Sequence, residues 1–296
     1  MLLAGDVGGT KTVLAIYESG VGTLEKVREQ TYPSRDYPSL DAICTDFLGR
    51  VAPTVTCRSA CFGVPGAVVD GHCKTTNLPW LISETALQSS LSIPKVRLLN
   101  DLQAAGYGML HLDRRELAVL NPGKAGGGNI AVIAAGTGLG EGLLVKVGDK
   151  YHPVASEGGH STFAARTDLE HELRAFVAKK LGSDDAHVSW ERVCSGMGLG
   201  NVYDFLKSKG VYEESPTVAA KLKLGDKGAV VGVEAVNGTD KLCNAAADMF
   251  AALYGAEAGN VALKFLATGG LFVGGGIAPK LLPVLQRGAF MKAFVD

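Results

Sequence analysis

A glutamate and a histidine stand three residues apart in the stretch ASEGGHS, as Glu157 and His160. On a helix this spacing would place both side chains on one face, where they could bind a metal ion. Gly158 and Gly159 disfavour a continuous helix, and the other nearby histidine, His152, is eight residues away from His160. We therefore do not expect a metal site. A carboxylate beside an imidazole suits sugar hydroxyls, although a lone histidine on a turn is more often a packed or capping residue.

Two glycine-rich stretches have the composition of phosphate-binding loops. The first, GDVGGTKT, runs from Gly5 to Thr12, and the second, GTGLG, runs from Gly136 to Gly140. Neither fits the dinucleotide pattern, and the first is followed by an apolar strand rather than the helix of a P-loop. Tight glycine turns between strands still direct several backbone N–H groups at one point, where anionic oxygen can bind. Taken alone, each stretch is also compatible with a plain hairpin.

Polar residues flank the first glycine turn. Thr10 adds a hydroxyl donor, and Lys11 adds a positive charge. Asp6 ends the preceding strand and is suited to hold Mg²⁺, directly or through water. These additions favour a nucleotide site over a plain hairpin.

The two glycine turns also repeat one design. Gly9-Thr10 and Gly136-Thr137 lie 127 residues apart, and each pair stands in a strand–turn–strand unit. Two such units predict two related domains that face each other. A third cluster, Gly274 to Gly276, follows a later apolar strand, and together the three predict a nucleotide cleft.

A further pair of polar residues ends the apolar strand VRLL. Asn100 and Asp101 follow it directly, at the carboxyl edge where α/β folds bind ligands. Asparagine and aspartate are also common helix N-caps. Both interpretations can hold together, with Asn100 capping a helix while Asp101 points toward a ligand.

Helices and strands alternate around these residues, which predicts an α/β fold. Apolar spacing predicts helices over residues 38–52, from the capping box Thr167-x-x-Glu170 to Gly182, and from about 240 to 267. The helix after Thr167 is expected to run through Leu169, Leu173, Phe176, Val177 and Leu181. Short buried strands are expected at 60–64, 96–99 and 271–273. A length of 296 residues favours two domains, divided between about 105 and 125.

Composition excludes several function classes. The chain has 29 basic and 30 acidic residues and no long Lys/Arg run, so neither nucleic acid nor an anionic membrane is an expected partner. No segment has the apolar length of a membrane span, and the N-terminus reads as a strand rather than a signal peptide. Six scattered cysteines without a C-x-x-C pair favour a reducing compartment. We expect a cytoplasmic protein.

Taken together and in order, these motifs resemble those of the bacterial-type glucokinases, which belong to the hexokinase/actin-like superfamily of sugar kinases. The matching stretches are GDVGGTKT, LLND, AAGTGLGEG, EGGHSTFA, ERVCSGMGL and FVGGGIAPK. The resemblance runs from Ala4 to about Phe294. It implies a two-domain actin-like/ribonuclease H-like ATPase fold with an interdomain cleft. It also implies ATP-dependent phosphorylation of glucose at the 6-hydroxyl, the entry step of glycolysis, with Mg²⁺ as the metal of the nucleotide.

The resemblance assigns roles to individual residues. Asp101 is implied as the catalytic base. The implied glucose contacts are Asn100, Asp101, Glu157, His160, Glu191 and Asn77. The implied nucleotide contacts are Asp6, Gly8, Gly9, Thr10, Lys11, Gly136, Thr137, Gly275 and Gly276. For Glu191 a plain alternative exists, because Glu191-Arg192 also reads as an exposed helix start.

Two departures from the family pattern qualify these expectations. The related repressor/sugar-kinase family carries a cysteine-rich zinc motif after Glu-x-Gly-His, whereas here STFAAR follows, so no structural zinc is expected. Family members usually continue with a strand and a helix that return to the small domain, and no such segment follows Asp296. The expected domains are therefore a small one over 1–108 and a larger one over 109–296. A homodimer is the protein partner considered.

Three other functions remain open at this point. The chain could be a kinase for another hexose or an amino sugar, a catalytically silent sugar-binding regulator, or an actin-like assembly protein of the same fold. Asp101 argues against the silent regulator, and the Glu157/His160 pair argues against the assembly protein.

Overall fold

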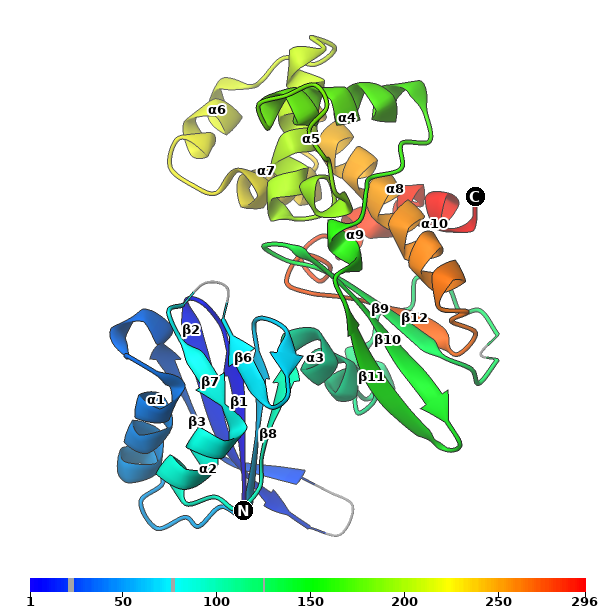
Figure 1. The fold of residues 1–296 in the computed structure, drawn as a ribbon. Coiled ribbons are helices and arrows are strands. Elements are labelled where there is room, and N and C mark those ends of the chain that lie inside the picture. Colours follow the sequence, from blue (N-terminus) through cyan, green and yellow to red (C-terminus); the bar gives the residue numbers. More distant parts are fainter. Residues whose placement is uncertain (21–23, 76–77, 125) are drawn as a thin grey trace. The chain divides into compact units, whose positions relative to one another are not determined.

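A computed structural model describes residues 1–20, 24–75, 78–124 and 126–296. The chain divides into two compact units, Met1–His111 and Leu112–Asp296, and each has a hydrophobic core of its own (Figure 1). The small and large domains expected over 1–108 and 109–296 remain a prediction, and each unit is described by itself.

The first unit is built on a five-stranded mixed sheet of order β3-β2-β1-β4-β8. The strands are β1 (Leu2–Val7), β2 (Lys11–Ser19), β3 (Leu24–Pro33), β4 (Ser59–Val64) and β8 (Val96–Asn100). The first three strands pair antiparallel, whereas β1, β4 and β8 run parallel. Alternate apolar side chains, among them Leu14, Ile16 and Phe62, are fully buried. The carboxyl ends of β1, β4 and β8 therefore share one edge of the sheet.

Helices and a small second sheet complete the first unit. The helices are α1 (Leu40–Asp46), continued by a π-helical turn η2 (Phe47–Val51), α2 (Glu84–Leu91) and α3 (Asp101–Met109), with the 3₁₀ turn η1 (Ser34–Asp36). The small antiparallel sheet contains β5 (Val68–Val69), β6 (His72–Lys74) and β7 (Leu81–Ser83). The helix predicted over residues 38–52 is confirmed in its core, because Leu40, Ile43 and Phe47 are buried.

The second unit repeats the strand order of the first around its own hairpin. Its sheet has the order β11-β10-β9-β12, with β9 (Ile130–Ala135), β10 (Leu139–Val147), β11 (Lys150–Ser156) and β12 (Gly270–Gly274). As β1 does with β2 and β4, β9 pairs antiparallel with the next strand and parallel with a later one. This shared topology supports the predicted internal repeat.

Seven α-helices are described in the second unit (Figure 1). They are α4 (Asp168–Lys180), α5 (Gly196–Ser208), α6 (Pro216–Leu222), α7 (Lys227–Asn237), α8 (Lys241–Lys264), α9 (Leu282–Leu285) and α10 (Ala289–Val295). Three 3₁₀ turns lie between residues 112 and 192, namely η3 (Arg114–Glu116), η4 (Gly158–His160) and η5 (Trp190–Arg192). None of the helices among the described residues is both long enough and apolar enough to cross a membrane.

Helix α8 is the centre of this core. It packs against β9 and β12 of the sheet and against α5, α7 and α10. Gly255 lies against the backbone of Phe290, where a Cβ would overlap the carbonyl oxygen, so only glycine allows α10 this close. Phe250, Tyr254 and Phe290 form successive edge or tilted ring contacts with centroids 5.7–5.8 Å apart.

The start of α4 departs from the sequence prediction in one respect. Thr167 is the N-cap and accepts a hydrogen bond from Glu170 N, as a capping box requires. The Glu170 carboxylate, however, accepts from Arg166 N at 2.7 Å and from the Arg166 guanidinium, so the reciprocal half of the box is wrong. The helix itself is confirmed, with Leu173 and Val177 buried and Leu169 and Leu181 exposed.

Candidate functional site

The first glycine turn joins β1 to β2 and is a true hairpin turn. Gly8 N donates to Lys11 O at 2.9 Å, which closes the turn. Ser34 anchors it from η1, since its hydroxyl donates to Gly8 O (2.7 Å) and its backbone N–H donates to Thr10 O (3.0 Å). The side chain of Thr10 remains exposed, as do those of Asp6 and Lys11. The prediction that this stretch is not a P-loop is confirmed, because strand β2 follows it.

At the end of β8, Asn100 is the N-cap of α3. Its Oδ1 accepts from Leu102 N (3.0 Å), and Gln103 Oε1 accepts from Asn100 N (3.1 Å), which completes a capping box. The amide Nδ2 donates to Gly66 O at 3.1 Å. The capping role considered for Asn100 is thus confirmed, while its contact with a sugar remains a prediction.

Asp101 is the first residue of α3 and is exposed. Its Oδ1 accepts a hydrogen bond from Leu102 N at 2.8 Å, at the positive end of the helix dipole. In the sheet register Asp6 lies opposite Gly63 on β4, and Gly63 lies opposite Leu99 on β8. Two strand spacings therefore separate Asp6 from this end of β8, roughly 10 Å. The fold brings both carboxylates to the same edge of the first sheet.

The predicted substrate contact Asn77 lies outside the described residues. Thr75, on the near side of it, is buried, and its hydroxyl donates to Leu78 O at 2.7 Å.

The second glycine turn joins β9 to β10. Gly136 N donates to Gly138 O within the turn (2.8 Å), and Gly196 N of α5 donates to Gly136 O (2.9 Å). Thr137 is exposed at the tip. The first turn of α5 thus lies directly against the predicted phosphate loop.

Gly275 and Gly276 lie beside the same turn. Gly275 has a φ of +79° and packs on Ala135 O so closely that a Cβ would overlap this oxygen. Ile277 N donates to the same oxygen at 3.1 Å. Both glycines are exposed.

A buried phenol ties this region to α8. Tyr254 Oη accepts from Ala135 N at 3.0 Å and lies 3.2 Å from Ile133 O and 3.4 Å from Gly274 O. The ends of β9 and β12, which carry the second and third glycine clusters, are therefore held by one side chain of the central helix.

Glu157 and His160 lie at the ends of a single 3₁₀ turn rather than on an α-helix. His160 Nε2 is 3.7 Å from Glu157 Oε2, and His160 Nδ1 is 4.0 Å from Glu191 Oε1. Their side chains are 61% and 74% exposed, for His160 and Glu157 in that order, so both reach solvent. The fold thus brings three predicted sugar contacts together. Within the part of the chain that the structure describes, no cluster of three His, Cys, Asp or Glu side chains could hold a metal ion.

Glu191 links this cluster to the second glycine turn. Its Oε2 accepts a hydrogen bond from Leu139 N, directly after the turn, at 3.1 Å. The alternative of an exposed helix start is correct in that Glu191 lies in the first turn of η5, but its side chain is only 20% exposed. Gly138 gives the carboxylate its space, because a Cβ there would overlap Glu191 Oε2.

A hollow of about 250 Å³ lies beside the first turns of α5 and α7. It is lined by Lys180, Gly196, Met197, Gly200, Asn201, Asp226, Lys227 and Gly228. Two helix N-termini and two lysines meet here, which makes the hollow favourable for a polar or anionic ligand.

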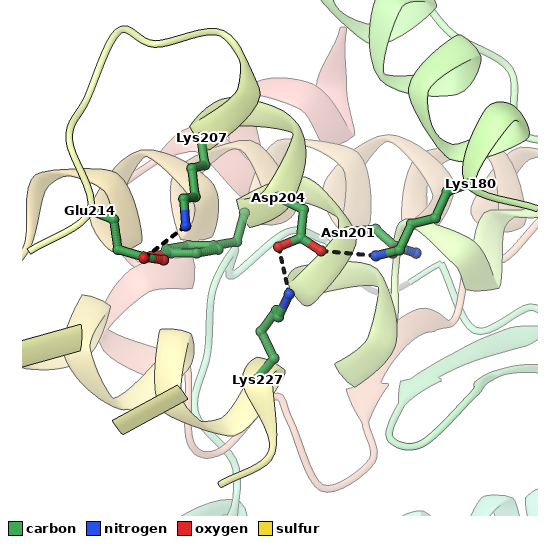
Figure 2. Close-up of polar contacts among 7 residues, drawn as sticks. Lys180, Asn201, Asp204, Lys207, Glu214 and Lys227 are labelled. Carbon is green, nitrogen blue, oxygen red and sulfur yellow. Dashed lines mark hydrogen bonds and ion pairs between the residues drawn. The ribbon is translucent and has the colours of Figure 1, made fainter. Parts of the chain in front are cut away.

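An ion-pair network supports one wall of this hollow (Figure 2). Asp204 accepts from Lys180 at 2.8 Å and from Lys227 at 2.6 Å, and Lys180 also donates to Asn201 Oδ1. Burial alone would raise the pKa of Asp204, but the hydrogen bonds from the two lysines bring it below its usual value. Lys207, which lies on the same helix as Asp204, donates to Glu214 at 2.7 Å.

The sequence did not predict this network. Lys180, Asp204 and Lys227 lie on α4, α5 and α7, and no local pattern joins them. The only signal was the motif ERVCSGMGL, which contains Gly196 and Met197 but neither lysine.

Comparisons with known proteins agree on one family. A family model described as Glucokinase matches residues 3–296. A glucokinase of Nostoc sp. is 42% identical over 307 residues, which cover 99% of this chain and 89% of its own length. The crystal structure of a glucokinase from an Antarctic psychrotroph superposes with a TM-score of 0.84 at 30% identity, covering 100% of this chain and 88% of that one.

One more distant structure shares the fold. It is a ROK family glucokinase from Streptomyces griseus, solved in complex with glucose and AMPPNP. Its TM-score is 0.66 at 21% identity, with coverage of 100% of this chain and 90% of that chain.

Proposed function

The chain belongs to the glucokinase family, and from this premise we propose that it transfers the γ-phosphoryl group of ATP to the 6-hydroxyl of glucose. The products are glucose 6-phosphate and ADP. The α/β fold is that of the actin-like sugar kinases, and the nucleotide and sugar motifs predicted from the sequence fit a kinase of this fold. The observation that carries the proposal is Glu191, whose carboxylate contacts both the second glycine turn and His160.

We propose that Glu157, His160 and Glu191 bind the ring hydroxyls of glucose. Carboxylates accept hydrogen bonds from hydroxyls, and an imidazole can donate or accept, so together the three match a ring that carries both functions. The exposure of Glu157 and His160 leaves their polar atoms available to a ligand, and the less exposed Glu191 lies beside them. Asn100 and Asn77 are proposed as additional amide contacts.

Asp101 is proposed as the general base that accepts the proton of the 6-hydroxyl. Its position at the positive end of α3 favours the ionised carboxylate, which is the form that a base requires. The transition state of phosphoryl transfer is loose, so the remaining residues act chiefly by positioning the reactants and stabilising charge.

The nucleotide contacts divide between the glycine turns. Backbone N–H groups of Gly9 and Thr10 are proposed to face the phosphates, with the ammonium of Lys11 beside them. Thr137 is proposed to act similarly from the second turn. Gly8 and Gly136, whose N–H groups close their own turns, are proposed to let the phosphates approach the backbone closely.

For the adenosine we propose the region of Gly275, Gly276 and the hollow beside α5. Both adjoin the second turn, since Ile277 N, directly after the glycines, donates to Ala135 O, and Gly196, which lines the hollow, donates to Gly136 O.

Asp6 is the residue proposed to hold Mg²⁺. Magnesium in phosphoryl-transfer enzymes is bound by one or two carboxylates together with the nucleotide phosphates, so a single exposed aspartate beside a phosphate turn fits. When bound, the ion would neutralise charge on the phosphates.

We further propose a cytoplasmic location and leave a homodimer as a prediction. All six cysteines are free, as expected in a reducing compartment.

The test is a coupled assay of ADP release with a panel of hexoses and amino sugars, with and without Mg²⁺. Glucose should give the highest kcat/KM, and removal of Mg²⁺ should abolish turnover. A higher kcat/KM with another sugar would make that sugar, rather than glucose, the proposed substrate. Absence of sugar-dependent ADP release with any member of the panel would overturn the kinase assignment and favour a sugar-binding regulator.

A further inference from the structure

A buried glutamate lies directly beneath the turn of Glu157 and His160. Glu141 stands on β10, where it pairs with Ser156 of β11, and its side chain is 2% exposed. Its Oε2 occupies the space that a Cβ of Gly158 would need, so the carboxyl group packs on the backbone of the turn. Ser156 Oγ accepts from Gly158 N at 2.9 Å beside it. The support of the turn therefore includes an ionisable group.

This carboxyl group lacks an ordinary hydrogen-bond donor. Oε1 of Glu141 is the one buried side-chain oxygen without a hydrogen-bond partner among the described residues. A buried ionised carboxylate without donors is strongly unfavourable. The charge of Glu141 must therefore be relieved in some other way.

The neighbour that faces Glu141 is a second buried acid. Glu257 of α8 is fully buried, and its side chain lies within hydrogen-bonding reach of Glu141. The two oxygens of Glu257 already have donors, Lys264 Nζ at 3.0 Å and Asn260 Nδ2 at 2.8 Å. Two ionised carboxylates can only accept, so their contact becomes a hydrogen bond only when one of them is protonated. Glu257 has the better anion environment, and the proton therefore belongs on Glu141.

We propose that Glu141 is a positioning residue for the sugar-binding turn and that it acts in its protonated form, by donating to Glu257. The inference rests on the proposed function, because it takes the turn of Glu157 and His160 to be the sugar site. Loss of this proton places two negative charges together below Gly158. The turn then relaxes, and the carboxylate and imidazole above it lose their spacing for the sugar.

The electrostatics of the surrounding groups agree with this assignment. Burial and, to a smaller extent, the charge of Glu257 raise the pKa of Glu141, the ammonium of Lys264 opposes them, and the net result is a pKa of about 7. The other titratable group that faces the pair is Cys194, whose thiol is neutral because burial raises its pKa. His160 and Glu157 lie on the turn itself.

The expected consequence is a sugar affinity that falls as pH rises through neutrality. If only the protonated form holds the turn, the apparent Kd for glucose scales inversely with the protonated fraction. Between pH 6 and pH 8 the KM for glucose then rises by up to about tenfold, while kcat at saturating glucose changes far less.

The experiment compares the wild-type chain with Glu141→Gln in glucose kinetics from pH 6 to pH 8.5. Glutamine keeps the shape, carries no titrating proton and donates its amide hydrogens to Glu257. It should therefore hold the glucose KM low across the range. Glu141→Ala should raise this KM at every pH. Glu234→Gln, which alters another buried glutamate on α7, should leave the pH profile unchanged.

A second measurement uses only the wild-type protein, so it does not depend on the folding of any variant. Infrared spectra of the wild-type protein should contain the carbonyl stretch of a buried protonated carboxyl at pH 6, which disappears by pH 8.5. Identical KM profiles for wild type and Glu141→Gln, or the absence of that band, would overturn the inference. Lack of glucose phosphorylation at every pH would instead overturn the proposed function, so the two failures are distinguishable.

Discussion

Glu191 Oε2 accepts a hydrogen bond from Leu139 N at 3.1 Å, while its Oε1 lies 4.0 Å from His160 Nδ1. One carboxylate thus spans the second glycine turn and the turn of Glu157 and His160. A group in this position can fix the distance between the proposed phosphate loop and the proposed sugar contact.

Replacement of Glu191 should therefore affect both substrates. In Glu191→Ala, Leu139 N loses its acceptor and His160 loses its neighbour, so KM for both ATP and glucose should rise, by about tenfold or more for each. Glu191→Gln keeps an acceptor and should be milder. Steady-state kinetics with each substrate varied in turn provides the measurement, and an effect on one substrate alone would contradict the linking role.

Asp101→Asn should keep glucose binding and lose turnover. The amide is nearly isosteric but cannot accept the hydroxyl proton, so kcat should fall by about 10² or more. The matched control is Asp41→Asn, another acid in the first turn of a helix of the same unit, which should retain kcat. Near-normal turnover of Asp101→Asn would remove it from the role of base.

Glu157→Gln and His160→Ala should chiefly weaken glucose binding, because each removes a group proposed to contact a ring hydroxyl. Isothermal titration with glucose should give Kd values about tenfold or more above that of the wild type. His152→Ala alters an exposed histidine on β11 and serves as the control. Unchanged affinity in both site variants would show that the sugar binds elsewhere.

Asp204→Asn should destabilise the second unit and weaken ATP binding, because Lys180 and Lys227 lose their shared anion (Figure 2). The expected loss is about 1–2 kcal/mol, since the lysines are partly exposed. The native pKa of Asp204 is depressed, so its contribution is present above the unfolded pKa, near 4, and is lost as pH falls through the native value. Urea unfolding of wild type and variant should therefore differ at pH 7 and converge in acid.

The control for that comparison is Glu172→Gln, which breaks an exposed ion pair with Lys209. It should change the free energy of unfolding by less than about 1 kcal/mol. An equal loss in both variants would mean that the network beside the hollow has no special weight.

Gly158→Ala should raise the glucose KM, since its Cβ would overlap the Glu141 carboxyl group. Shortening the opposing side chain makes room, so the double variant Gly158→Ala/Glu141→Ala should be less impaired than the two single effects combined. A double-mutant cycle on glucose affinity measures this coupling. Strict additivity would show that the two residues do not press on each other.

The parts of the fold that were predictable are those encoded locally. The turn after Asp6, the strand ending at Asn100 and the long helix after Asp240 follow from neighbouring residues, and the structure contains all three. The turn at Glu157 and His160 was also predictable, because the two glycines between them disfavour an α-helix and favour a turn.

Long-range pairings and side-chain competition were not predictable. Glu141 of β10 interacts with Glu257 of α8 across more than 100 residues of sequence, and nothing in either local sequence indicates this contact. The capping-box pattern is present at Thr167, but the Glu170 carboxylate accepts from the guanidinium of Arg166 instead of completing the box. Leu169 fits the apolar spacing of α4, yet it is 43% exposed, since tertiary contacts rather than periodicity decide burial.

The side chain of Tyr254 connects helix α8 to strands β9 and β12 of the second unit. Its hydroxyl accepts a hydrogen bond from Ala135 N and lies 3.4 Å from Gly274 O. A rotation or translation of α8 would therefore displace the ends of β9 and β12, and with them two glycine clusters. The rigidity of both glycine clusters therefore depends on how α8 packs against α5, α7 and α10, and a substitution that loosens this packing should increase the mobility of the proposed phosphate loops.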